Sequence, residues 1–164
     1  MVNKTTIEKN LNHIDNLYNK HIGDKEAVYY CKLAILEICG WIEETMDDIV
    51  RSCANKHLKD PSSITIIEEI IQNTHSFKYR DNFRNMLRQL IGLINLENLE
   101  NMFDGTKFPV MESSLGALKQ SRDDLAHTYI KGTTTTINAP SFSINHFKYV
   151  YQGLKDIEKC LRAI

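Results

Sequence analysis

Apolar residues recur at three- and four-residue steps along most of the chain, which is the spacing of helices with one buried side. The first such stretch covers about residues 4–22 and ends at Gly23 and Asp24, which suit a helix end and a new N-cap. The pattern then continues to residue 58. It predicts either one long helix over residues 24–58 or two helices with a kink near Gly40.

Further helices are predicted beyond the breaker Asp60-Pro61. The isoleucine-rich segment 64–74 favours a short helix by its spacing, although the isoleucines also permit a strand. Other helices are predicted over about residues 79–94, 96–102, 109–126 and 143–164. Only the Thr-rich segment 132–138 is β-prone, as an extended segment or a loop.

These elements predict one all-α domain over residues 1–164, a helical bundle of about five to seven helices with a Thr-rich loop before the last. No internal repeat and no linker long enough to separate domains interrupts the pattern. Composition agrees, because 42% hydrophobic and 25% charged residues are ordinary values for a globular chain of 164 residues.

Charge and cysteine usage narrow the class of protein. Lys+Arg number 20 and Asp+Glu number 21, which excludes a strongly basic nucleic-acid-coating protein but allows a local basic groove. The four cysteines form no CxxC motif, so we expect reduced thiols in a cytoplasmic protein. Residues 1–10 are polar, unlike a signal peptide, and no apolar run approaches the roughly 18 residues of a membrane span, so no membrane association is expected.

The segment Ser121–Tyr129 is the best candidate for chemistry. On a helix, Asp123 and His127 lie about 40° apart, so the carboxylate can accept a hydrogen bond from the imidazole and favour its charged form. Arg122 and His127 lie about 140° apart, so they make no direct contact but can line one groove with a neighbouring helix or a second copy. The alternative is a solvated helix end whose charges compensate the helix dipole.

The sequence RDDLAH at residues 122–127 resembles the Arg-x4–6-His motif of the HEPN superfamily, in which a polar residue commonly follows the arginine. Asparagine is usual there, and Asp123 takes its place. The order of CGWIE at 39–43, LIGL at 90–93, this motif and a last amphipathic helix resembles the RiboL-PSP and related bacterial defence-linked groups. The similarity covers about residues 24–164, and the six motif residues carry most of it.

The resemblance implies a metal-independent endoribonuclease, a toxin or defence effector that needs no cofactor and acts as a homodimer. The RNA 2′-OH would attack the adjacent phosphodiester, with His127 as general base or acid. Arg122 would stabilise charge on the phosphorus oxygens, and Asp123 would orient the site. The alternatives are a non-catalytic HEPN module that binds nucleotides or a protein, and an unrelated helical bundle.

Tyr129 extends the motif to Arg-x4-His-x-Tyr, which resembles the form in HepT-like toxins. There the tyrosine is a target for AMPylation by a partner nucleotidyltransferase, so the partners implied are an antitoxin or such an enzyme. The alternative is that Tyr129 packs against the last helix, and the longer segment after Gly132 is more similar to the RiboL-PSP group.

Two weaker patterns complete the candidates. Arg80, Arg84 and Arg88 repeat at four-residue spacing and form a stripe that can bind RNA phosphates; the alternative is a solvated face paired with nearby acids such as Asp81. Cys53 and His57 share one helix face but supply only two ligands, so no metal site is expected. The acidic residues of the long helix are expected on its solvent side; they are Glu43, Glu44, Asp47 and Asp48.

Overall fold

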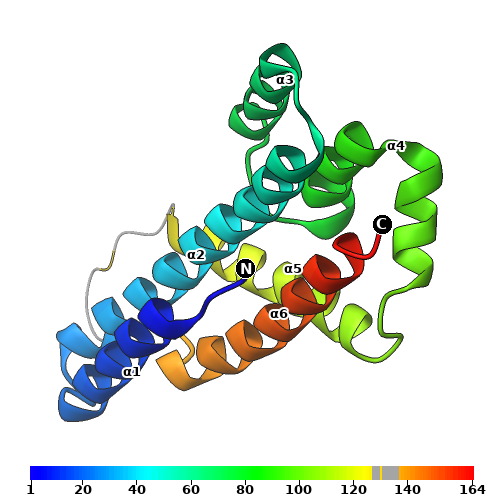
Figure 1. The fold of residues 1–164 in the computed structure, drawn as a ribbon. Helices are drawn as coiled ribbons and strands as arrows, with labels where there is room; N and C mark the ends of the chain where they lie inside the picture. The colour runs from blue at the N-terminus through cyan, green and yellow to red at the C-terminus, as the bar shows by residue number, and fades with distance from the viewer. Residues whose placement is uncertain (127–129, 131–136) are drawn as a thin grey trace.

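Every regular element that the computed structural model describes is a helix, and it describes residues 1–126, 130 and 137–164. The elements in chain order are α1 (Thr5–Lys20), α2 (Lys25–His57), α3 (Pro61–Gln72), the π-helical turn η1 (Tyr79–Phe83), α4 (Arg84–Asn101), α5 (Lys107–Ala126) and α6 (Pro140–Leu161) (Figure 1). The predicted all-α class is confirmed. Most of the Thr-rich segment, residues 132–136, lies outside the described residues. None of the helices in the described ranges combines the length and apolar composition of a membrane span.

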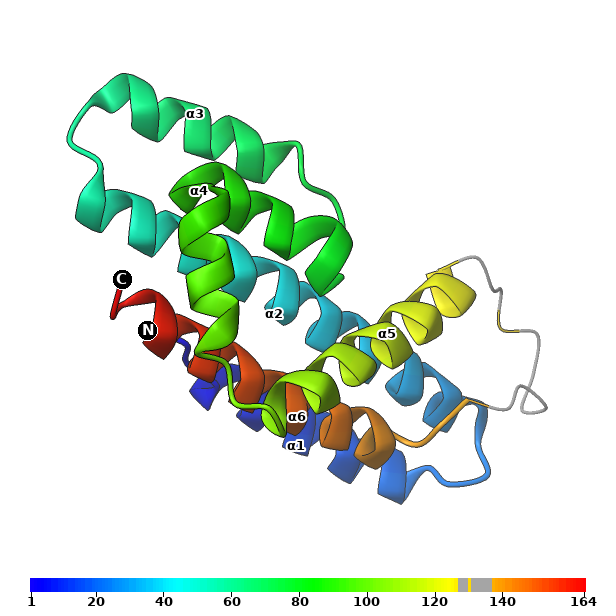
Figure 2. The same ribbon diagram turned by 90° about the vertical axis from the view of Figure 1, so that its right-hand side faces the viewer.

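Helix α2 is the centre of the molecule. It runs for 33 residues without interruption at Gly40, so of the two predictions the single long helix is confirmed. It contacts α1, α3, α4, α5 and α6. In Figures 1 and 2, α1 and α6 lie along its length, while α3 and α4 cover its C-terminal end. Its core-facing side chains, among them Ile38, Ile42 and Val50, are fully buried.

The N-cap side chain makes a capping hydrogen bond in α3 but not in α1, α2, α4 or α6. Gly23 ends the α1–α2 connection with a φ of +96°, a conformation that glycine adopts at no steric cost. Asp60 caps α3 by accepting a hydrogen bond of 2.9 Å from the Ser62 amide. Asp24 occupies the N-cap position of α2, but its carboxylate makes no capping hydrogen bond and lies 3.6 Å from His21 Nδ1.

The helix pair predicted over 79–94 and 96–102 has a different break in the structure. The segment starts as a π-helical turn, and the break falls at Gly92, with φ +75° and ψ 166°, instead of near residue 95. Figure 2 shows the resulting sharp bend in α4. Glu100 in the last part of α4 accepts hydrogen bonds from Arg84, at 2.7 and 2.9 Å, and from Tyr79, at 2.9 Å. These contacts link the two sides of the bend.

Helices α5 and α6 pack closely, which fixes the position of the α5 C-terminal end. Gly153 of α6 lies against the buried Met111 of α5, so close that a Cβ atom there would lie 2.6 Å from the Met111 Cβ. Leu115 and Leu118 continue the buried side of α5 toward Arg122. The predicted helix after Pro109 is confirmed with an earlier start, because Pro109 lies inside the first turn.

Candidate functional site around Arg122

Arg122 lies in the C-terminal part of α5 and joins that helix to α2. Its Nη1 lies 2.7 Å from Oε1 of Glu43, which is 79 residues earlier in the sequence. The Arg122 side chain is 24% exposed and that of Glu43 is 39% exposed, so the ion pair is partly shielded from solvent. An arginine–carboxylate pair in such a setting has a defined geometry.

An aromatic ring supports the same guanidinium from another direction. The Arg122 Cζ lies 5.1 Å from the centroid of Phe77, whose side chain is fully buried. This distance is in the range of a cation–π contact. Phe77 follows Ser76, which has a φ of +91° and a buried hydroxyl without a hydrogen-bond partner in the described part of the chain. Ser76 therefore has an unfavourable backbone conformation directly before the ring that contacts Arg122.

Asp123 forms ion pairs with two basic side chains of its own helix. It forms ion pairs with Lys119, one helical turn earlier, and with Arg122, whose Nε and Nη2 each lie 3.3 Å from its Oδ1. The hydrogen bond from Lys119 is the main reason that the pKa of Asp123 lies below its usual value, and Arg122 adds to the effect. His127 and Tyr129 lie outside the described residues, so the predicted contact between Asp123 and His127 stays a prediction.

The acidic face of α2 continues beyond Glu43. Burial is the main reason that the pKa of Asp47 rises to about 6, and the carboxylates of Glu43, Asp48 and Glu68 add to the rise against the opposing effect of Arg51. Glu43 forms an ion pair with Arg122, and Asp47 is partly buried. The expectation that the acids of α2 face solvent is therefore wrong for these two residues.

A buried thiol lies on the inner side of the same helix contact. Burial raises the pKa of Cys39 to about 12, and its Sγ lies 3.9 Å from the Leu118 carbonyl oxygen. A thiol with so high a pKa is a poor nucleophile at neutral pH. Cys39 therefore acts as a core residue between α2 and α5, and the chemistry of the site falls to the charged groups.

Two of the three arginines in the predicted basic stripe form ion pairs with carboxylates of the same chain. Arg80 pairs with Glu112 of α5 at 2.6 Å, and Arg84 pairs with Glu100 of α4 at 2.7 Å. Asp81, which the sequence suggested as a partner of the stripe, pairs with Lys78. Arg88 is exposed. RNA binding by Arg80, Arg84 and Arg88 stays a prediction.

The other candidate, the pair of Cys53 and His57, lines a shallow hollow with Leu90, Ile91 and Leu161 of neighbouring helices. No group of three or more His, Cys, Asp or Glu side chains in the described ranges is placed to hold a metal ion. The thiol of Cys53 is half-buried, and burial raises its pKa.

Sequence reasoning identified Arg122 and Asp123 but missed three residues that hold them. The Lys119–Asp123 pair is readable from its four-residue spacing on a helix. Glu43 and Phe77 come from distant segments, and nothing local marks either as a partner of Arg122. Comparison of the chain with protein-family models, with curated protein sequences and with solved structures gives no match.

Proposed function

We propose that the chain is a metal-independent endoribonuclease of the HEPN type that works as a homodimer. The observation that carries the proposal is the guanidinium of Arg122, which Glu43 and Phe77 hold in the last turns of α5, five residues before His127 in the sequence. A fixed guanidinium suits the stabilisation of phosphate oxygens, and a histidine in the same motif suits proton transfer at neutral pH.

In the proposed reaction, the RNA 2′-OH attacks the adjacent phosphorus atom while the bond from phosphorus to the 5′-oxygen breaks. His127 accepts the proton of the 2′-OH or supplies one to the leaving 5′-oxygen. Arg122 donates hydrogen bonds to the non-bridging oxygens as their charge increases. The products are a 2′,3′-cyclic phosphate end and a 5′-OH end, and no metal ion is needed because the nucleophile belongs to the RNA.

The two ion pairs of Arg122 differ in how easily a phosphate can replace the carboxylate. The bond to Glu43 is short, at 2.7 Å, and anchors the side chain to α2. The bonds to Asp123, at 3.3 Å, are long and come from the neighbouring residue, which also pairs with Lys119. We expect a phosphate oxygen to take over the Nε and Nη2 edge, while Glu43 keeps the guanidinium in place.

An apolar stripe on α2 supports the dimer. Tyr29, Leu33 and Leu36 are exposed by 47%, 42% and 41%, and their steps of four and three residues put them on one face of the helix. The same spacing continues through Gly40, whose Cβ position is open, to Glu43. A second copy that covers this stripe would lie next to the Arg122–Glu43 pair, as a composite site requires.

The nuclease proposal is tested with purified full-length protein on single-stranded RNA in the presence of EDTA. Arg122→Ala and His127→Ala are each expected to reduce cleavage by at least about a hundredfold, the usual range for a general acid–base or charge-stabilising group. Lys148→Ala, an exposed cation on α6, is the matched control and should retain activity. Cleavage that survives both site variants, or that EDTA abolishes, would refute the proposal.

The dimer is tested separately by light scattering after size exclusion. Leu33→Glu should convert the dimer to a monomer and lower RNA cleavage in parallel. Leu93→Glu, an equally drastic change at a side chain that is 60% exposed at the bend of α4, should change neither. A chain that is monomeric at every concentration, or whose dimer ignores Leu33→Glu, contradicts the proposed assembly.

A second candidate is a non-catalytic HEPN module, and the observation that favours it is the intramolecular neutralisation of arginines. Arg80, Arg84 and Arg122 all pair with carboxylates of the same chain, which weakens any attraction for RNA phosphates. Such a module would bind a nucleotide or a partner protein at Arg122 without cleaving RNA. Nucleotide binding that Arg122→Ala abolishes, in protein that leaves RNA intact, would favour this alternative.

A further inference from the structure

Two hollows that share Cys53, His57 and Leu161 form one groove where α2, α4 and α6 meet. We call it the α2–α4–α6 groove. The volumes of the hollows are about 220 and 260 Å³, so together they reach the lower part of the range of about 300–1,000 Å³ that small-ligand pockets usually have. Arg122 is not among the lining residues, so the groove is separate from the candidate nuclease site.

The bend of α4 supplies one wall of the groove. Leu90 and Ile91 lie directly before Gly92, where the helix bends, and both line the groove. Asn95 lies after the bend and lines it too, and its side-chain amide donates to the Ile91 carbonyl oxygen at 2.9 Å. This hydrogen bond joins the two sides of the bend, so the fold itself holds the wall in place.

Apolar side chains cover most of the groove. Those that the argument uses are Ile49, Cys53, Leu58, Leu90, Ile91 and Leu161. Four of them, Cys53, Leu58, Leu90 and Ile91, pack against the core but are only partly buried, so part of their surface is left to water. An apolar ligand in the groove would remove this surface from water, which favours binding. An unbranched alkyl chain suits the small volume better than a helix, which is about 10 Å across.

The charge at one end of the groove favours an anion. Burial raises the pKa of the Cys53 thiol, and the ammonium of Lys56 partly opposes this rise, which places the ammonium near the thiol. Lys56 has no ion pair or hydrogen bond with the part of the chain that the structure describes. It therefore offers an unpaired cation beside an apolar surface, the arrangement that recognises an amphipathic anion.

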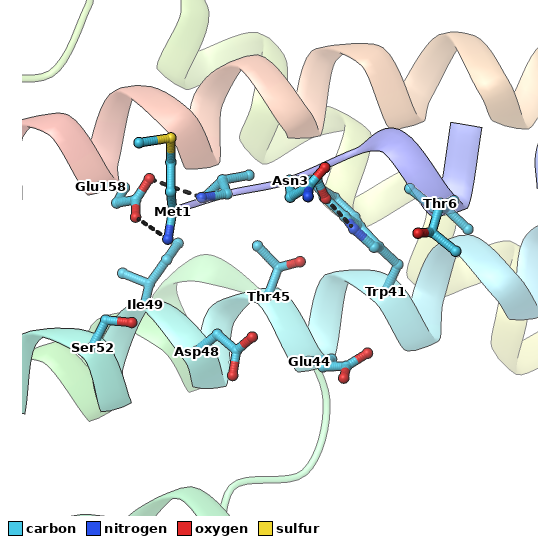
Figure 3. Close-up of a pocket in the computed structure, with 12 residues that line it drawn as sticks. Met1, Asn3, Thr6, Trp41, Glu44, Thr45, Asp48, Ile49, Ser52 and Glu158 are labelled. Carbon is cyan, nitrogen blue, oxygen red and sulfur yellow. Dashed lines mark hydrogen bonds and ion pairs between the residues drawn. The ribbon is translucent and has the colours of Figure 1, made fainter. Parts of the chain in front are cut away.

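The acidic side chain in the lining is already neutralised. Glu158 accepts a hydrogen bond from the Val2 amide at 2.9 Å and pairs with the Met1 ammonium at 3.1 Å, as Figure 3 shows. It also pairs with Arg162 at 2.7 Å. No other aspartate or glutamate is among the described residues that line the groove. The lining thus has no unpaired acidic side chain that would repel an anion.

We infer that the α2–α4–α6 groove binds the anion of a medium-chain fatty acid. The carboxylate pairs with the Lys56 ammonium, and the alkyl chain lies along Leu58, Leu90 and Ile91. This binding does not depend on RNA cleavage, because the groove contains none of the residues proposed for the nuclease reaction.

The inference is tested by following the alkylation of Cys53 with iodoacetamide in the full chain by mass spectrometry. Cys53 lines both hollows and is half-buried, whereas the other three cysteines are buried, so its reaction reports on the groove. Octanoate should slow the reaction in a saturable way. Hexanoate, which is two methylene groups shorter, should need about a tenfold higher concentration for the same protection. No saturable protection by octanoate, or equal protection by uncharged 1-octanol, would overturn the inference.

Two variants then locate the carboxylate. Lys56→Gln removes the charge of an exposed side chain and should weaken octanoate binding in calorimetry by about twofold to fivefold at low ionic strength, the effect of one exposed ion pair. Lys59→Gln, at an exposed lysine that does not line the groove, is the matched control and should bind like the unmodified chain. Unchanged binding in Lys56→Gln, or equal weakening in Lys59→Gln, would refute the assignment.

Two further results would give the groove a different occupant and overturn the inference. Protection of Cys53 that increases with protein concentration in the absence of octanoate would indicate a second copy of the chain. Protection by vesicles of phosphatidylglycerol, without protection by dissolved octanoate, would indicate a membrane surface.

Discussion

Gly153 of α6 is the position where the packing of α5 on α6 makes the sharpest demand on the sequence. A Cβ atom at this residue would lie 2.6 Å from both Cβ and Cγ of Met111 and would also overlap its sulfur. The sulfur can rotate away, but the Met111 Cβ is attached to the α5 backbone and cannot. Gly153→Ala therefore forces the two helices apart, in a region where Met111 is fully buried.

Two opposing effects set the expected magnitude. Alanine is better than glycine in a helix interior by about 1 kcal/mol, which by itself would stabilise the variant. Overpacking of a well-filled core costs about 1–3 kcal/mol, and a clash with a backbone-fixed atom falls in the upper part of that range. We expect a net loss of about 1–2 kcal/mol in the free energy of unfolding, with a fall in Tm of about 2–8 °C for a chain of this size.

The assay is thermal and urea unfolding followed by circular dichroism, with Gly116→Ala as the matched control. Gly116 also lies in a helix, but nothing is within 4 Å of its Cβ position, so this variant should be stabilised by up to about 1 kcal/mol. The double variant Met111→Ala/Gly153→Ala should lose less stability than the sum of the losses in the two single variants. If Gly153→Ala is as stable as Gly116→Ala, the close approach of α5 and α6 is wrong.

Three further changes have expected outcomes. Asp47→Asn should stabilise the fold by about 1–2 kcal/mol at pH 7–8, because the native state must hold a charged carboxylate in a half-buried place, at a cost that solvent partly screens. Urea titrations should show that this gain vanishes below about pH 4, where the carboxyl is protonated in both the folded and the unfolded state. Burial alone would raise the pKa of Glu158, but hydrogen bonds from the Val2 amide and Arg162 hold it below its usual value. Glu158→Gln should therefore destabilise the chain by about 1–3 kcal/mol at pH 7, with the difference shrinking below pH 4.5, and a pH-independent difference would contradict this assignment. Ser76→Gly should raise stability by about 1 kcal/mol, because it removes a positive φ at a non-glycine residue and an unsatisfied buried hydroxyl, and a lower Tm would count against that backbone conformation.

The helical architecture was predictable because helix periodicity is a local property. The apolar steps through residues 24–58 continue without a proline, and α2 accordingly spans Lys25–His57. The behaviour of single glycines was less predictable. Gly40 stays helical, whereas Gly92 takes a positive φ and bends α4. The difference depends on contacts across the bend, such as Arg84 with Glu100, and these are invisible to a local pattern.

Of the residues at the candidate site, only those on α5 could be predicted from the sequence. The motif on α5 contains Arg122 and Asp123 in consecutive positions, and spacing alone is enough to pair Lys119 with Asp123. Glu43 could not be chosen as a partner of Arg122, because a reading by helix face treats all the acids of α2 as equally solvated. Only the crossing of α2 by α5 selects this carboxylate.

Glu43 and Glu44 show how one helix can serve two separate surfaces. Consecutive residues on a helix point about 100° apart, so when the first faces α5 the second must face a different neighbour. Glu43 binds Arg122, and Glu44 lines a pocket between the N-terminal segment, α2 and Glu158 of α6, with its carboxylate unpaired within the described chain. The packing of α1 and α6 on one side of α2 and of α5 on another thus divides a run of like charges into a neutralised anchor and a free anion. Because the division follows from helix geometry, a change at either glutamate should leave the surface of the other intact.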